Sequence, residues 1–169
     1  MKSKKIFPDR SWAQVMSPED LGYSSNQLQD AQAFSEGLAT SAVVIVKGGR
    51  ILKEWGAVDT RHIMFSARKS FMNALFGNYV EQGVVNLDRT LADIGIDDKV
   101  PLSEEEKQAT IRDVIKARSG VYHPVNYTGW PMPERGSHRP GSYFYYNQWD
   151  FNVAGSIFEK LTDKNIFEA

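Results

Sequence analysis

The sequence of 169 residues has no cysteine, and this absence excludes several kinds of chemistry at once. Without a thiol the chain can form no disulfide, bind no zinc through sulfur and use no cysteine as a nucleophile. The redox state of the compartment therefore cannot be inferred from the sequence.

An excess of charge of one sign is also lacking. Lys and Arg number 20 while Asp and Glu number 21, which gives a formal net charge of −1. Nucleic-acid-binding domains normally carry a basic excess, so we expect no nucleic-acid partner. The 41% of apolar and 24% of charged residues are values of an ordinary globular domain.

Long apolar runs are missing as well. No stretch approaches the ~20 residues that a membrane helix requires, so we predict no membrane span. The N-terminus is basic but is not followed by the apolar stretch of a signal peptide. This favours the cytoplasm over the periplasm, although the sequence does not fix the compartment.

The first 65 residues combine an extended lead-in over 1–23 with a helix and a hairpin. Ser24 and Gln27 have the spacing of a capping box and predict the start of the helix. Two short apolar runs, 42–46 and 51–55, flank a Gly-Gly turn and predict a β-hairpin. The first run is apolar on both faces, so we expect both faces to be covered.

From residue 66 onward the apolar spacing is mainly helical. Helices are predicted from 66 to about 82, from 111 to about 117, and from about 150 onward. Between them, 121–146 is irregular and rich in aromatics, and loops longer than roughly 12–15 residues are often functional. Two further capping boxes are predicted, Ser103 with Glu106 and Thr110 with Asp113.

These elements predict a single α+β domain over residues 1–169. Its first part, 24–65, contains the helix and the hairpin, and its second part, 66–169, is helical and carries the aromatic loop. The two predicted strands alone make a marginal sheet in water.

The pair Ser66 and Lys69 is the sharpest chemical feature of the sequence. Residues three apart share one face of a helix, so the hydroxyl and the amine can meet. A serine becomes a nucleophile when a neighbouring base takes its proton, and an amine can be that base. Capping of the helix is the alternative role for Ser66.

The tripeptide Tyr145-Tyr146-Asn147 closes the aromatic loop. With Tyr122 and Trp130, Tyr146 forms a set that either walls a cleft for an apolar substrate or packs the loop onto the core. The three histidines, His62, His123 and His138, lack the clustering of a zinc site, so we expect no metal and no cofactor.

Taken together, Ser66-Ala67-Arg68-Lys69 and the later Tyr145-Tyr146-Asn147 resemble the penicillin-recognising serine hydrolases. This superfamily includes class C β-lactamases, D-alanyl-D-alanine carboxypeptidases, esterases and nylon-oligomer amidases. Further stretches are similar to the family's β-lactamase-related branch: Glu81-Gln82-Gly83, Leu87-Asp88, Ser119-Gly120 and Arg135 to Gly141.

The resemblance implies a β-lactamase/transpeptidase-like fold and a role for each matching residue. Ser66 would be the acylated nucleophile, its backbone N–H half of the oxyanion hole, and Lys69 its proton acceptor. Tyr145 would relay protons to the leaving group. Asn147 would bind the amide of the substrate and orient Lys69, while Tyr122, Trp130 and Tyr146 would contact the substrate.

The resemblance also implies that the chain is the N-terminal portion of a longer protein. The family's third motif, K/H-[ST]-G on a late strand, is absent from the sequence. A C-terminal segment or a second chain would then complete the sheet. The predicted function is a serine hydrolase acting on an ester or amide, β-lactams and D-amino peptides included. The alternative is a non-catalytic, truncated member that binds a small ligand or a partner.

Overall fold

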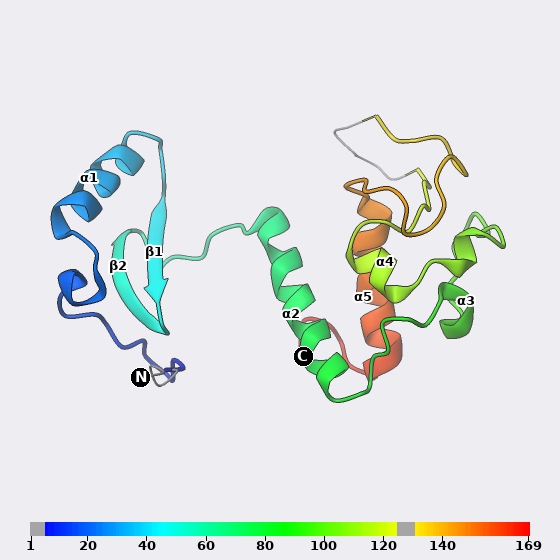
Figure 1. Cartoon of the computed structure of the whole chain (residues 1–169), viewed down its shortest axis with the longest axis horizontal. Coiled ribbons are helices and arrows are strands. Elements are labelled where there is room, and N and C mark those ends of the chain that lie inside the picture. The colour runs from blue at the N-terminus through cyan, green and yellow to red at the C-terminus, as the bar shows by residue number, and fades with distance from the viewer. Residues whose placement is uncertain (1–5, 125–130) are drawn as a thin grey trace. The chain divides into compact units, whose positions relative to one another are not determined.

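The computed structural model describes residues 6–124 and 131–169, which form two compact units (Figure 1). The first unit ends at Ile63 and the second begins at Met64. This boundary lies close to residue 66, where the sequence pattern changes from hairpin to helix.

The first unit contains a short 3-10 helix η1 (Pro18–Leu21), helix α1 (Ser25–Glu36) and a hairpin of β1 (Ala42–Lys47) and β2 (Arg50–Gly56). The strands are antiparallel. The predicted cap is confirmed, because the backbone N–H of Gln27 donates to Ser24 Oγ at 3.3 Å.

The turn of the hairpin uses two glycines with positive φ, Gly48 at 58° and Gly49 at 80°. Such angles match the right-handed twist of the strands and are costly for other residues. The indole Nε1 of Trp55 donates to Ser35 Oγ at 2.8 Å and ties the hairpin to α1. The expected cover of both faces of β1 is not found, because Val44 and Val46 remain about half exposed.

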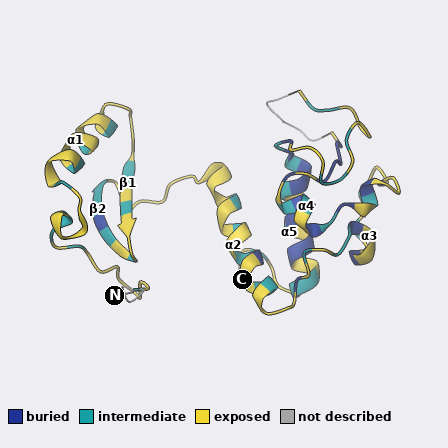
Figure 2. Cartoon of the chain, viewed as in Figure 1, coloured by how far each residue is buried: buried dark blue, intermediate teal, exposed yellow. Residues whose placement is uncertain are grey.

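The second unit contains the helices that surround the main core. Its longest are α2 (Arg68–Glu81) and α5 (Gln148–Thr162), with shorter segments between them: η2 (Phe65–Ala67), α3 (Leu91–Ile94), η3 (Glu106–Gln108) and α4 (Ile111–Ile115). Figure 2 shows that buried positions concentrate in α4 and α5, whereas α1 is mostly exposed. The core includes Phe76, Leu91, Ile111, Val114, Val121, Ile157 and Phe158.

Capping boxes fix the starts of the short helices. The predicted box at Thr110 and Asp113 is present, and a second one joins Thr90 and Asp93 before α3. The predicted pair at Ser103 is also confirmed, because its backbone N–H donates to Glu106 at 2.8 Å. Each box satisfies backbone donors that would otherwise lack a partner.

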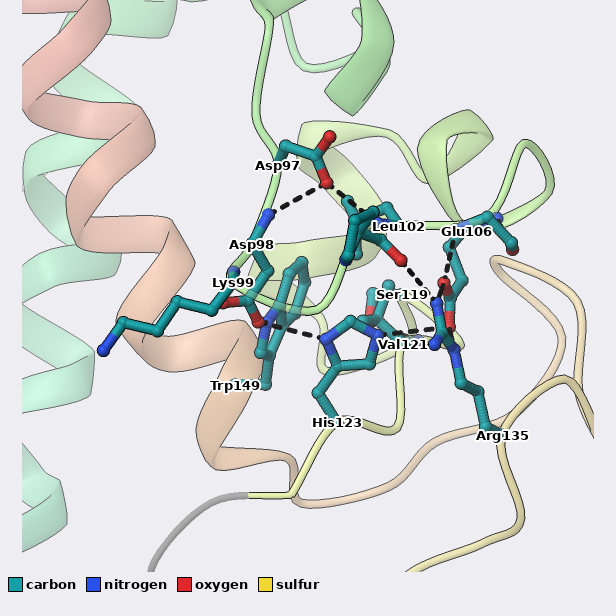
Figure 3. A network of polar contacts seen from close by, with 12 residues as sticks. Asp97, Asp98, Lys99, Leu102, Glu106, Ser119, Val121, His123, Arg135 and Trp149 are labelled. Carbon is teal, nitrogen blue, oxygen red and sulfur yellow. Dashed lines mark hydrogen bonds and ion pairs between the residues drawn. The ribbon is translucent and has the colours of Figure 1, made fainter.

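The described parts of the aromatic loop lack regular secondary structure and are held by a network of polar contacts (Figure 3). Arg135 donates two hydrogen bonds to the carboxylate of Glu106, at 2.9 and 2.6 Å. His123 Nδ1 lies 3.0 Å from Asp98 Oδ2, which also accepts from the indole of Trp149 at 2.8 Å. The network joins the loop to η3 and to the first turn of α5.

The segment before α5 is fixed through its backbone. The N–H of Tyr145 donates to the carbonyl of Ala117 at 3.0 Å, and that of Gly141 to Arg118 at 2.8 Å. Among the described residues, no helix is long and apolar enough to cross a membrane.

Candidate active site

Ser66 and Lys69 lie within one helical turn and contact each other. Ser66 belongs to η2, which runs directly into α2, where Lys69 is the second residue. The amine of Lys69 lies 3.2 Å from Ser66 Oγ, a hydrogen-bonding distance. The spacing of three therefore brings the two groups together, as the sequence predicts.

A third group, the hydroxyl of Tyr146, completes a triangle with these two. It donates to Ser66 Oγ at 2.7 Å and accepts a short hydrogen bond from Lys69 Nζ. Tyr146 lies just before α5, 80 residues after Ser66, so packing of the second unit creates the triangle. Each of the three polar atoms contacts the other two.

The position of Tyr145 corrects the sequence prediction by one residue. The hydroxyl beside Ser66 and Lys69 belongs to Tyr146, whereas the ring of Tyr145 packs edge-on against Tyr122, with centroids 5.9 Å apart. Tyr145 and Asn147 are buried and Tyr146 between them is half-buried. Neighbouring side chains of an extended segment point to opposite sides, so only one of two adjacent tyrosines can face Ser66.

The hydrogen bonds of the Asn147 side chain are structural, and none of those that hold it reaches Lys69. Its predicted contact with the substrate stays a prediction. Its Nδ2 donates to the carbonyl of Val121 at 2.6 Å, and its Oδ1 accepts from the N–H of Trp149 at 3.1 Å. The side chain is 1% exposed and caps α5. It thus fixes the start of the helix directly after Tyr146.

Of the aromatic residues predicted to wall a cleft, Tyr122 and Tyr146 lie in the described part of the chain, and Tyr146 lines an apolar pocket with Tyr143, Phe144 and Tyr145. Tyr122 is buried, and its ring contacts Tyr145 and His138. Burial, followed by the charge of Asp150, raises the pKa of Tyr122. Of the two predicted functions of the set, packing is the one that Tyr122 performs. Trp130 lies outside the described residues.

Within the triangle, the pKa of Tyr146 is shifted by its neighbours. The hydrogen bond donated by Lys69 is the main cause that lowers the pKa of Tyr146, and the contact with Ser66 is the second. Arg68 adds a smaller effect of the same sign. A cationic donor stabilises the phenolate more than the phenol, so a larger fraction of this tyrosine is ionised at a given pH than of an ordinary one.

Two features near the site could not be predicted from the sequence. Phe65, directly before Ser66, has a φ of 43°, an angle that a bulky residue rarely adopts. Strain of this kind is concentrated at functional sites. Phe151 contacts both Lys69 and Tyr146. The spacing of apolar residues in α5 gives no sign that Phe151 differs from its neighbours.

No group of three or more His, Asp or Glu side chains in the described part of the chain could hold a metal ion. The contacts at Ser66 offer the chemistry of a hydroxyl next to an amine and a phenol. Such a set can deprotonate a serine and return the proton later.

The chain belongs to the beta-lactamase family, whose sequence model matches residues 26–169. Its structure is similar to that of a Bacillus anthracis protein described as a 6-aminohexanoate-dimer hydrolase, with a TM-score of 0.58 and 18% identity. The match covers 90% of this chain and 49% of the other, so the chain spans about half of that protein's length. No curated protein matches the sequence.

These comparisons confirm the predicted fold class. The fold is β-lactamase-like, and within the described residues it consists of helices and one small antiparallel sheet of two strands. The expected family is confirmed by the match over residues 26–169.

Proposed function

We propose that the protein is a serine hydrolase that cleaves an ester or an amide through an acyl-enzyme at Ser66. The observation that supports this most is the triangle of Ser66 Oγ, Lys69 Nζ and the Tyr146 hydroxyl. Family membership supports the same reaction class. The proton-relay role that the sequence assigned to Tyr145 is now proposed for Tyr146.

In the first step, Ser66 Oγ attacks the carbonyl carbon while its proton passes to the Lys69–Tyr146 pair. The carbonyl oxygen becomes an oxyanion, and the backbone N–H of Ser66 provides one of its hydrogen bonds. Collapse of this intermediate breaks the bond to the leaving group. Tyr146 returns the proton to the leaving nitrogen or oxygen, because its hydroxyl lies 2.7 Å from Ser66 Oγ.

In the second step, a water molecule attacks the acyl-enzyme and the same groups act in reverse. Lys69 and Tyr146 take a proton from the water, and Ser66 recovers its hydroxyl as the acid is released. Candidate substrates are esters, β-lactams and D-amino peptides. The name of the structural match, a hydrolase of 6-aminohexanoate dimer, adds a linear amide.

Covalent labelling tests this proposal. The protein is treated with a fluorophosphonate, a β-lactam or an activated ester, and its intact mass is then measured. We expect a mass gain that disappears in Ser66→Ala. Ser70→Ala is the matched control, because Ser70 is an exposed serine one turn later in α2.

Labelling that persists in Ser66→Ala would contradict the proposed nucleophile. No labelling by any of the probes would favour the alternative, a binding module without catalytic activity. A binding module would still retain a reversible ligand, which calorimetry with the same uncleaved compounds would detect.

A further inference from the structure

Phe151 contacts two members of the triangle without carrying a polar group itself. The amine of Lys69 lies 3.9 Å from the centroid of the Phe151 ring. The rings of Tyr146 and Phe151 meet at 60° with centroids 4.9 Å apart. One aromatic face therefore borders both the amine and the phenol.

The helix start explains this position. Asn147 caps α5, so Tyr146 lies just outside the helix and Phe151 lies in its first turns. A small cavity of about 50 Å³ separates Lys69 from the core, and its lining is mainly apolar. Lining residues are Lys69, Met72, Asn73, Phe76, Ile115, Phe151 and Ala154.

Besides its hydrogen bonds to Ser66 and Tyr146, the amine of Lys69 lies against two aromatic rings, that of Phe151 and, at 4.2 Å from its centroid, that of Tyr146. Within the described residues, none of the ion pairs joins a carboxylate to Lys69. Arg68, its neighbour on α2, is a cation and cannot compensate the charge. On α5, the carboxyl of Asp150 is directed to the N–H of Ser119, at 3.5 Å.

An aromatic face attracts a cation through the negative charge density of its π system. Phe151 therefore attracts the ammonium group of Lys69 and holds it next to the Tyr146 hydroxyl. A neutral amine would receive far less from the same ring. An aliphatic side chain of similar size would fill the space without this attraction.

We propose that Phe151 is a positioning residue that holds Lys69 as an ammonium against the oxygen of Tyr146, so that Tyr146 exchanges the proton with Ser66. This inference rests on the proposed function. In the reactive form of the site, Tyr146 has first lost its own proton to solvent and is a phenolate. As Ser66 then attacks, its O–H bond breaks and the proton moves to this phenolate oxygen. The proton later leaves Tyr146 for the leaving group, and Lys69 keeps its charge throughout.

The first test compares Phe151→Leu and Phe151→Trp by the rate of labelling at Ser66 across pH. Loss of the ring should slow labelling by roughly 2- to 30-fold, the range of a cation–π contact. The acidic limb of the pH profile should move to higher pH, because a less well held ammonium stabilises the phenolate less. Phe151→Trp keeps an aromatic face, so its labelling rate and the acidic limb of its pH profile should stay close to those of the parent protein. Phe34→Leu is the control, because Phe34 is an exposed phenylalanine of α1.

A second test separates charge from shape. Phe151 is replaced by phenylalanines carrying one, two and three fluorines, which withdraw charge from the ring face while its size barely changes. The labelling rate should fall stepwise with the number of fluorines. A flat series in protein labelled at Ser66 would overturn the inference. This series also applies if Phe151→Leu does not fold.

A third measurement does not depend on activity. The titration of Tyr146 is obtained from ultraviolet absorbance as the difference between the protein and Tyr146→Phe. Phe151→Leu should move this titration to higher pH, and an unchanged titration would contradict the role of Phe151. A shifted titration in protein that no probe labels would refute the proposed function and the proton exchange with Ser66, and would keep only the hold of Phe151 on Lys69 and Tyr146. Labelling at Ser66 with an unchanged titration of Tyr146 would support the proposed function and refute the role of Phe151.

Discussion

At the scale of single residues, the first prediction distinguishes Tyr146 from Tyr145 as the tyrosine that relays the proton. We expect Tyr146→Phe to slow acylation of Ser66 by about 10²–10⁴-fold, the usual contribution of a positioned acid or base. Tyr145→Phe should have a much smaller effect, because its ring packs against Tyr122 instead. The rate of labelling by an activated ester measures both. A larger loss in Tyr145→Phe would return the relay to the residue that the sequence predicted.

The second prediction for a single residue concerns Asp150 and the pH dependence of the free energy of unfolding. Asp150 is buried, Oδ1 has no hydrogen-bond partner among the described residues, and Oδ2 accepts from Ser119 at 3.5 Å. Burial is the main cause that raises the pKa of Asp150 from 3.8 to about 8. The folded state therefore binds this proton more tightly than the unfolded chain does.

The sign of the effect on stability follows from linkage. Between about pH 4 and pH 8 the folded protein holds a proton that the unfolded chain has lost, so the free energy of unfolding falls as pH rises. Asp150→Asn should remove this decline and gain stability over the parent at pH 8. Melting temperatures at pH 5 and pH 8 test it. Equal declines in both proteins would show that Asp150 is not the group responsible.

At the scale of elements, the contact between Arg135 and Glu106 holds the loop that carries Tyr146. Burial raises the pKa of Glu106, but the hydrogen bonds from Arg135 and Ser103 outweigh it and lower the pKa overall. Arg135→Met would leave the carboxylate of Glu106 without its cation in a mostly buried position. We expect the free energy of unfolding to fall by roughly 1–3 kcal/mol.

Denaturant unfolding measures this loss, and acylation should slow as well because the loop positions Tyr146. Arg112→Met is the control, since Arg112 pairs with Asp88 on the exposed surface. That change should cost less than about 1 kcal/mol. Adding Glu106→Gln to Arg135→Met should recover part of the loss. Equal losses of unfolding free energy in Arg135→Met and Arg112→Met would show that the ion pair of Arg135 with Glu106 does not hold the loop.

At the scale of the whole molecule, we expect the backbone N–H groups of the two units to differ in their protection from hydrogen exchange. Within the described residues the sheet has two strands, β2 gains a single parallel bridge from Ile51 to Gln14, and none of the β1 side chains is fully buried. Five residues of α5 are buried, and four of them belong to the main core. A sheet of two strands is marginal in water, so its hydrogen bonds should open more often.

Hydrogen exchange followed by mass spectrometry tests this difference. Peptides covering 42–56 should exchange faster than peptides covering 148–162, with α5 among the last to exchange. Equal protection of both segments would mean that the hairpin is covered in solution. That result would agree with the expectation, drawn from the apolar pattern of β1, that both of its faces are covered.

The elements that depend on neighbours along the chain could be predicted from the amino-acid sequence. The helix cap at Ser24, the capping boxes at Ser103 and Thr110 and the Gly-Gly turn lie where their spacing predicts, because hydrogen bonds over two to four residues fix them. The contact of Ser66 with Lys69 belongs to the same class, because three residues of helix separate the two.

The tertiary structure alone decided which residues meet across the chain. Tyr145 and Tyr146 are equivalent in a linear pattern, and only the packing of the segment before α5 turns Tyr146 toward Ser66. The same packing uses Asn147 as a cap and adds Phe151 beside Lys69. Such contacts depend on the direction in which a side chain leaves a buried segment, and no local spacing records that direction.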